Sequence, residues 1–380
     1  MPLTLLLHGK HGGPGVTYEP LGPWLVPWRL RPDGMRDDYA ALRGGTGLVD
    51  YSTQALLECR GADRTGFLQR LLTNDVASLA PGAGCRAALL TPTAKLVADL
   101  LVLAEADAHW LLCDLPQAGV VAATLERYRF TERVTLTFHE RRLAVLALEG
   151  PRAMERLTAL TGSPLALHRT GDHTTATLDG VSVRLIRRSL TGGVGAWCVF
   201  EAEQLESVWA LLGERGQPRG VRPVGWEALN AARIESGEPW VGVDMDETVL
   251  LPETGLDTVL ASDAKGCYVG QEIVARMRTY GSASKRLMGL MLEGEAQAQP
   301  GDRITTHGEE AGWITSACDS PALGRPIAMG YVKRGAYEAG RRVEVVHNGA
   351  RLRAIVTALP FVRASSSHAS TVNRPPSTIA

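Results

Sequence analysis

The pattern of apolar residues changes at Arg286, and this change limits the fold more than any other feature of the sequence. Before Arg286, strand-like and helix-like segments are mixed without strict alternation, which is typical of an α+β fold rather than of a doubly wound parallel sheet. After it come only short strand-like segments separated by glycine turns, as in a small β-barrel or sandwich. The chain therefore needs at least two structural units, and its 380 residues are enough for two or three.

Several segments of the first part can be assigned one by one. Residues 54–60 alternate as in a half-buried strand, and Asp63 can begin the helix that follows. Residues 86–90 and 95–103 flank a turn with Pro92, which predicts a hairpin. The remaining expected elements are a strand over 109–113, a helix from Pro116 to about Tyr128, a strand over 143–148 with a helix over 152–160, and a helix from Pro223 to Ile234.

Four regions follow from these assignments. The glycines and lysine of residues 9–15 do not have the spacing of a phosphate-binding loop, so residues 1–21 are expected to be a flexible N-terminal extension. Residues 22–280 should form two α+β lobes, and residues 281–363 a β-barrel. Residues 364–380 contain nine Ser, Thr or Pro and are expected to be a disordered tail.

Charge and hydropathy exclude some classes of function. Forty basic residues against forty-one acidic ones give a net charge of −1, whereas a protein held to nucleic acid by bulk charge is usually much more basic. We therefore expect no direct nucleic-acid partner. No segment reaches the roughly 18 apolar residues of a membrane helix, and no secretory signal is recognisable. The expected location is the cytoplasm, without membrane attachment.

The six cysteines lie far apart, with no pair at two-residue spacing, so no zinc site or other metal site is expected. Most of them should be small core residues. Cys267 differs because it follows Lys265 and precedes a helical segment that begins at Gln271. A nearby ammonium group and a helix N-terminus both favour a thiolate. On chemistry alone, however, a lone cysteine between glycines is more often structural.

A resemblance to a known family adds to this hypothesis. The segment that carries it is Lys265-Gly266-Cys267-Tyr268-Val269-Gly270-Gln271-Glu272. It resembles the Lys-Gly-Cys-Tyr-x-Gly-Gln-Glu signature of the YgfZ-type folate-binding proteins, relatives of the glycine cleavage T-protein, an aminomethyltransferase. Further similarity lies in residues 42–52, 61–75, 150–153, 233–237 and 315–332, so that it extends over about residues 22–362.

The resemblance implies a three-lobed aminomethyltransferase-like fold with tetrahydrofolate, or a one-carbon derivative of it, in a central cavity. Asp99 lies where T-proteins have a functional aspartate on a strand, although Ala98 replaces the first residue of the usual Asp-Asp pair. A carboxylate there can accept neighbouring N–H groups of a pterin. By strand alternation alone, Asp99 would instead face solvent.

Three further residues are candidates for the folate cavity. Arg233 lies at the position of the family's arginine and can pair with a folate carboxylate or brace the site. Its simpler alternative is a surface ion pair with Glu235 or Glu238. Trp240 replaces a tyrosine and can stack on a ring or belong to the core. Arg276 follows the signature segment.

The chain departs from the T-protein pattern at one point. T-proteins carry acidic residues after the positions of Thr191-Gly192, whereas here Gly193-Val194-Gly195-Ala196-Trp197 follows without a carboxylate. Leu190 also stands where a tyrosine is usual. Either the pterin contacts must differ or the binding must be weaker, and the departure weakens the aminomethyltransferase hypothesis.

Two functions and a simpler alternative remain. The first is a YgfZ-like factor that supports iron–sulfur proteins, including tRNA-modifying enzymes, through Cys267 and with iron–sulfur client or assembly proteins as partners. The second is a folate-dependent aminomethyltransferase in which Asp99 positions or deprotonates the attacking folate nitrogen. The third is a folate-binding module without chemistry.

Overall fold

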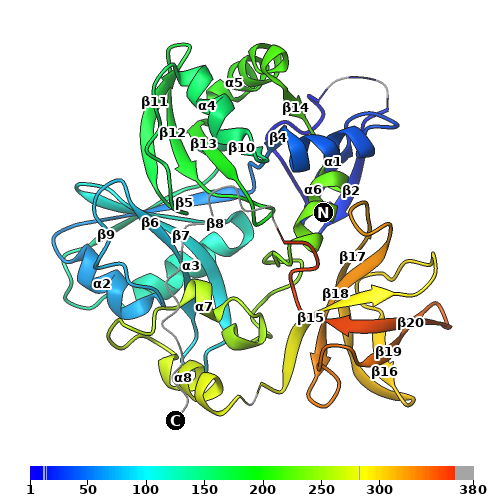
Figure 1. Cartoon of the computed structure of the whole chain (residues 1–380). Helices are drawn as coiled ribbons and strands as arrows, with labels where there is room; N and C mark the ends of the chain where they lie inside the picture. Colours follow the sequence, from blue (N-terminus) through cyan, green and yellow to red (C-terminus); the bar gives the residue numbers. More distant parts are fainter. Residues whose placement is uncertain (12, 14, 282, 364–380) are drawn as a thin grey trace, which may run out of the picture.

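The computed structural model describes residues 1–11, 13, 15–281 and 283–363, which form two mixed lobes and a barrel (Figure 1). The α+β class and the C-terminal barrel predicted from the sequence are confirmed. The expected disordered tail, residues 364–380, lies outside the described residues. Among the residues described, no helix has the length and apolar character needed to cross a membrane.

The first lobe is built on a six-stranded sheet of order β11-β12-β13-β10-β4-β14. Its helices α4 and α5 pack on one face, where Leu157 and Val208 meet leucines of β4 and β10. The elements are β4 (Thr46–Asp50), β10 (Leu143–Glu149), α4 (Ala153–Thr161), β11 (His173–Leu178), β12 (Val181–Arg187), β13 (Gly195–Glu201), η1 (Ala202–Gln204), α5 (Leu205–Ala210), η2 (Leu211–Arg215), η3 (Gln217–Arg219) and β14 (Val221–Pro223).

The second lobe is built on a five-stranded antiparallel sheet of order β6-β7-β8-β5-β9. Helices α2 and α3 bury one face of it; in β7, Leu96, Ala98 and Leu100 are buried, and the last two belong to the core beneath these helices. The elements are β5 (Gln54–Arg60), α2 (Arg64–Leu71), β6 (Gly84–Leu90), β7 (Leu96–Ala104), β8 (Ala108–Asp114), α3 (Leu115–Arg127) and β9 (Thr135–His139). The predicted strand over 54–60 and the predicted hairpin are confirmed.

The N-terminal residues are part of the fold. Strands β1 (Leu3–Thr4), β3 (Trp24–Arg29) and β2 (Thr17–Leu21) form a three-stranded sheet in that order. Leu5 and Leu7 are each 2% exposed and lie in two different hydrophobic clusters. The prediction of a flexible extension over residues 1–21 is therefore wrong for these segments, because their partners lie later in the chain.

Two helices connect the first lobe to the barrel. Helix α1 (Met35–Gly44) packs on α6 (Trp226–Glu235), and α6 in turn contacts the barrel strand β17. The predicted helix from Pro223 begins later than expected, because residues 221–223 pair with β4 as strand β14. Beyond α6 follow η4 (Leu251–Glu253), α7 (Asp257–Leu260) and α8 (Gln271–Tyr280).

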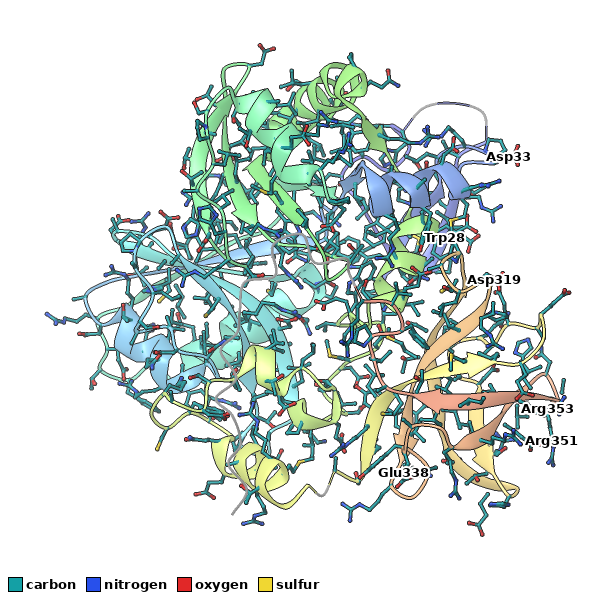
Figure 2. The ribbon with its side chains drawn as sticks, in the orientation of Figure 1. Trp28, Asp33, Asp319, Glu338, Arg351 and Arg353 are labelled. Atoms are coloured by element: carbon teal, nitrogen blue, oxygen red, sulfur yellow. The ribbon has the colours of Figure 1, made fainter. Side chains whose placement is uncertain are left out.

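The C-terminal barrel closes in the order β15-β18-β17-β16-β19-β20. Figure 2 labels Trp28 and Asp319 at the junction between the N-terminal segment and the barrel, where both line one groove. The strands are β15 (Lys285–Leu292), β16 (Arg303–Thr306), β17 (Glu309–Ser320), β18 (Arg325–Lys333), β19 (Arg342–His347) and β20 (Ala350–Thr357).

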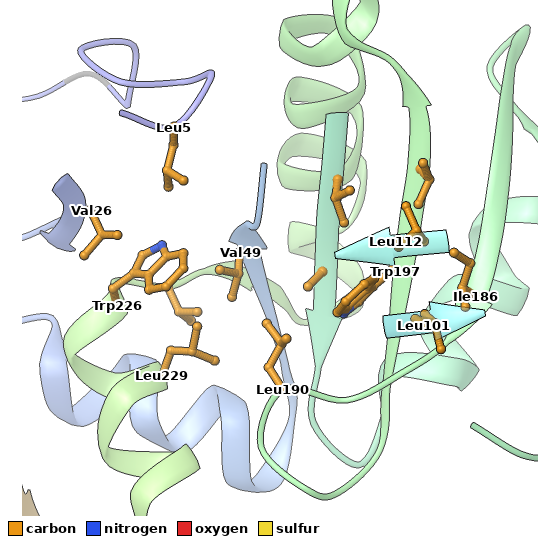
Figure 3. Packing of buried hydrophobic residues seen from close by; sticks show 14 of the residues in the cluster. Leu5, Val26, Val49, Leu101, Leu112, Ile186, Leu190, Trp197, Trp226 and Leu229 are labelled. Carbon is orange, nitrogen blue, oxygen red and sulfur yellow. The ribbon is translucent and has the colours of Figure 1, made fainter. Parts of the chain in front are cut away.

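The largest shared core lies between the two sheets of the N-terminal lobes. Figure 3 shows Trp197 of β13 beside Leu101 and Leu112 of the other sheet, with Trp226 and Leu229 of α6 on the far side of Val49. One face of each sheet is covered by its own helices, so the free faces turn toward each other. A cavity opens between these two faces.

Candidate active site

The register of the second sheet places polar side chains on its free face. Leu101 of β7 pairs with Leu112 of β8. Residues two apart on a strand share a face, so Asp99 and Asp114 lie on the same face, each two residues beyond this pair. The neighbouring strand β6 adds Arg86, which pairs with Leu101 of β7. Arg86 therefore lies one pair away, on the same face, from Asp99 and its partner Ala88.

The cavity between the lobes has a volume of about 80 Å³ and opens to solvent. Its walls come from both sheets, from β3, from α3 and α6, and from the segment after α6. The lining residues are Leu21, Trp24, Tyr51, Thr53, Gln54, Arg86, Asp99, Leu101, Leu112, Asp114, Gln117, Arg188, Trp197, Trp226, Pro239, Trp240, Val241 and Val243.

Aromatic rings form one wall of this cavity. The Tyr51 ring is stacked on Trp226 with 5.8 Å between centroids, and Trp226 contacts Trp240 edge-on at 5.6 Å. Trp197 lies 5.2 Å from Tyr51. Such rings offer flat apolar surfaces to a planar ligand.

Two arginines and two carboxylates form a chain of ion pairs in the cavity. The Arg86 guanidinium donates to both Asp99 oxygens, at 2.5 and 3.4 Å, and to Glu238 Oε1 at 2.8 Å. Arg188 reaches the same Glu238 oxygen at 3.0 Å. Burial alone would raise the pKa of Glu238, but the two arginines outweigh it and the pKa is lowered.

The expectation that Asp99 faces solvent if judged by alternation alone does not hold, because the free face of β7 is covered by the first lobe.

Asp114 has a different environment from that of Asp99. It accepts hydrogen bonds from the indole N–H of Trp24, at 3.1 Å, and from Thr53. Burial raises the pKa of the Asp114 carboxyl to about 7, and these two hydrogen bonds lower it only in part. The two carboxyl groups of the cavity thus differ in their partners.

A buried carboxyl group holds the loop that departs from the T-protein pattern. Glu149 accepts hydrogen bonds from Ser189 Oγ at 2.8 Å, from Leu190 N at 2.9 Å and from Thr191 Oγ1 at 3.1 Å. Leu190 is 1% exposed and belongs to the shared core. The loop therefore contributes to packing, and Trp197 after it contributes an aromatic ring to the cavity wall.

Arg233 lies behind the cavity wall. Its side chain is fully buried and pairs with Asp244, with Nη1–Oδ2 at 2.5 Å, while it also donates to Asn230 and Ser316. The guanidinium carbon stands 4.6 Å from the centre of the Trp240 ring. The prediction that Arg233 lines the cavity is wrong, because its donors are used inside the protein. The surface ion pair with Glu235 or Glu238 is also wrong, because Arg233 is fully buried. That Arg233 braces the site stays a prediction.

Trp240 lines the cavity as predicted, whereas Arg276 does not. Arg276 is exposed on α8. This helix lies below the second lobe in Figure 1, away from the space between the two sheets. The prediction that Arg276 lines the folate cavity is therefore wrong.

The signature segment forms a loop before α8 and lies outside the cavity. The Lys265 ammonium donates to the carbonyl oxygens of Gln69, Leu72 and Asn74. An ammonium group has three donors, so these three bonds leave none for the Cys267 thiol. Burial lowers the pKa of Lys265 to about 8. Lys265 thus fastens the loop to the segment after α2.

The other signature residues shape this loop. Gly270 has φ +84°, and a Cβ there would lie 2.9 Å from the Thr91 carbonyl oxygen, so glycine is required. Gly266 has no such constraint, since its Cβ would meet nothing within 4 Å. Tyr268 is buried, its N–H donates to Gln271 Oε1 at 3.3 Å, and Glu272 is exposed in the first turn of α8.

Cys267 is exposed, unlike the other five cysteines. Cys59, Cys113 and Cys198 are buried, and Cys85 and Cys318 are partly buried. Burial raises the pKa of Cys59, Cys85, Cys113 and Cys198 to about 12 and also raises that of Cys318. Cys267 is therefore the most accessible thiol of the six.

Comparison with known proteins identifies the family. Residues 7–264 match the family described as "GCVT N-terminal domain", and residues 285–363 match "Glycine cleavage T-protein C-terminal barrel domain". The chain belongs to the glycine cleavage T-protein family. Residues 265–284 of this T-protein family member, which include the signature segment, lie between the two matched regions.

Relatives extend over nearly the whole chain. The "Probable aminomethyltransferase" of Natronomonas pharaonis is 32% identical over 366 residues, covering 93% of this chain and 98% of the relative. The "Aminomethyltransferase" of Anoxybacillus flavithermus is 28% identical, with 94% and 97% covered. The glycine cleavage system aminomethyltransferase T of Bartonella henselae has the same fold, with a TM-score of 0.84 at 24% identity over 96% and 99% of the two chains.

The sequence did not point to several residues of the cavity. Three of them line its wall, namely Arg86, Asp114 and Arg188. Glu238 does not line the cavity, but it accepts hydrogen bonds from both arginines. The available signal was that Asp114 lies two residues after Leu112 in β8 and therefore on the same face of the strand. This signal places Asp114 beside Asp99 only if the pairing of β8 with β7 is known.

Proposed function

We propose that this T-protein family member is a folate-dependent one-carbon transferase of the aminomethyltransferase class. The observation that carries the proposal is the cavity in which Asp99, held by Arg86, faces a wall of aromatic rings. The names of the relatives favour this function over the iron–sulfur hypothesis, since those compared above are called aminomethyltransferases.

The residues of the cavity fit a reduced folate. A pterin has a flat ring with adjacent N–H donors, so it requires aromatic surfaces and carboxyl acceptors. Tyr51, Trp226 and Trp240 supply the surfaces, and Asp99 and Asp114 supply the acceptors. When bound, tetrahydrofolate would supply the nitrogen that accepts the one-carbon group.

Asp99 would orient this nitrogen. Its carboxylate is fixed by two hydrogen bonds from Arg86, which is itself fixed by Glu238. A ligand held by a fixed group loses less orientational freedom in the reaction itself.

The test is transfer to tetrahydrofolate from an aminomethyl donor, measured as methylenetetrahydrofolate formed. We expect product with the wild-type protein, a loss of at least about a hundred-fold with Asp99→Asn, and wild-type rates with Asp107→Asn. Asp107 is a matched control because its side chain is 73% exposed in the turn between β7 and β8. Binding of tetrahydrofolate without any product would instead support a folate-binding module without chemistry.

The exposed thiol favours a second candidate function. A YgfZ-like role in maintaining iron–sulfur proteins requires Cys267 to be reachable by a partner, and Cys267 is exposed on a loop that Lys265 and Gly270 hold against the second lobe. In a deletion strain of the source organism, an iron–sulfur enzyme should lose activity. Wild type should restore it and Cys267→Ala should not; full rescue by Cys267→Ala would exclude the thiol role.

A further inference from the structure

Asp99 and Asp114 present two carboxyl groups side by side to the cavity. They project from the neighbouring strands β7 and β8, on the face that also carries Leu101 and Leu112. Carboxyl groups placed together with different surroundings can take different roles in one reaction, one as a fixed charge and the other as a proton carrier.

Their hydrogen-bond partners differ in charge. Both oxygens of Asp99 accept hydrogen bonds from the Arg86 guanidinium, so Asp99 has a cation as its partner. The partners of Asp114 are Trp24 and Thr53, which are neutral. Among the described residues, no ion pair joins Asp114 to an arginine, lysine or histidine.

Both carboxyl groups line the cavity with Tyr51 and influence its pKa. Tyr51 hydrogen-bonds to Thr53, and its pKa is raised first by burial and then by the charge of Asp114; Asp99 adds to this shift and Arg188 opposes it. The charged or titratable groups of the cavity wall besides Asp114 are Arg86, Asp99, Arg188 and Tyr51. The two arginines share Glu238, so their charges are balanced by Glu238 and Asp99.

We propose that Asp114 is the proton acceptor of the one-carbon transfer, and that Asp99 is the fixed carboxylate that orients the folate. This inference rests on the proposed function. It assigns the proton to a residue other than the aspartate expected from the family resemblance, because the oxygens of Asp99 are already engaged by Arg86.

The proposed step balances without an added reactant. A new bond joins the folate nitrogen to the transferred carbon, and the bond from this carbon to its donor atom breaks with the electron pair left on the donor atom. Asp114 takes the proton that the folate nitrogen loses. It then gives this proton to the released donor atom and becomes a carboxylate again. In a second step of the same kind, the other folate nitrogen bonds to this carbon and the bond from the carbon to its amino group breaks. The proton of this second nitrogen passes through Asp114 to the amino group, which leaves as ammonia, and methylenetetrahydrofolate is formed.

The acidity of Asp114 agrees with this assignment. A general base works best when its pKa is near the working pH, and burial raises the pKa of Asp114 to about 7. The carboxylate form of Asp114 therefore increases as the pH rises through 7. Transfer rates limited by this proton should rise over the same range.

The experiment uses Asp114→Asn, which keeps an acceptor for Trp24 and can donate to Thr53, so the fold should be retained. Protein labelled with ¹³C at aspartate carboxyl carbons should show a resonance with a midpoint near pH 7 that is lost in Asp114→Asn and retained in Asp107→Asn. Glu149, which also titrates near pH 7, carries no label. Single-turnover transfer to tetrahydrofolate should fall by about 10²–10⁴-fold and lose its rise with pH near 7.

Binding of 5-formyltetrahydrofolate separates failure of this inference from failure of the proposed function. If this probe does not bind the wild-type protein, the proposed function fails. If it binds and the Asp114 resonance titrates near pH 4, or if Asp114→Asn transfers at the wild-type rate, the function stands and the inference is overturned. Binding to Asp114→Asn within about ten-fold of wild type, together with loss of transfer, supports it.

Discussion

Arg86 of strand β6 lies diagonally across from Asp99 of β7, with Arg86 Nη2 2.5 Å from Asp99 Oδ2. The same guanidinium also bonds Glu238, so one cation organises two carboxylates at the cavity wall. The Arg86 side chain is only 6% exposed. Its charge is therefore poorly screened by solvent, and its removal has consequences for both stability and binding.

Arg86→Met should lower the free energy of unfolding by about 3–5 kcal/mol, because removal of one partner leaves buried charges uncompensated. Urea denaturation measures the change. Arg60→Met is the control: Arg60 pairs with Glu58 and Asp107 at the surface, and its loss should leave the urea midpoint unchanged. Equal midpoints for Arg86→Met and wild type would show that Asp99 and Glu238 do not depend on this arginine.

The sequence predicted the elements that depend on local patterns. Strand β5 and helix α2 were expected from alternation and from Asp63 at the helix start, and both form. Asp63, however, bonds Arg133 rather than capping its helix. The N-terminal strands were missed because β1 has two residues and is defined by its pairing with β3, which is not visible in a local pattern.

The site was predicted only in part, because several of its residues also depend on contacts that a local sequence pattern does not show. Asp99 and Trp240 were expected from the family resemblance, and both line the cavity. Asp114 required the pairing of β8 with β7, which the single sequence did not provide. Arg86 lies in the predicted hairpin, but the sequence did not show which face of that hairpin lines the cavity. Arg233 matched the family position, but it is buried behind Trp240. There it forms an ion pair with Asp244. A match in sequence position thus does not show whether a side chain lines the cavity or lies behind the residues that line it.

Gly270→Ala should destabilise the signature loop by about 1–2 kcal/mol, because φ there is +84° and an alanine in this region is strained. The added Cβ would also approach the Thr91 carbonyl oxygen. Gly266→Ala is the matched control, since its Cβ would enter open space. Urea denaturation should separate the two variants; equal destabilisation would mean that contact with Thr91 does not hold the loop.

Glu149 should make the protein less stable as the pH rises from about 4.5 to 7. Burial raises its pKa in the folded state from 4.5 to about 7, so the folded state binds more protons than the unfolded state in this window. In Glu149→Gln, the difference in unfolding free energy between pH 4.5 and 7.5 should shrink by about 2–3 kcal/mol. The exposed Glu155→Gln on α4 should keep the wild-type dependence, and an unchanged slope in Glu149→Gln would contradict the assignment.

Cys267 should be the one thiol of the native protein that reacts rapidly with a disulfide reagent such as 5,5′-dithiobis(2-nitrobenzoate). It is exposed, whereas the other five cysteines are buried or partly buried and burial raises their pKa. A thiolate is the reactive form, so these five should react only on unfolding. Cys267→Ser should therefore abolish the rapid phase, while Cys85→Ser should leave it intact. A rapid phase that persists in Cys267→Ser would place the accessible thiol elsewhere and remove the structural support for a thiol-dependent function at this loop.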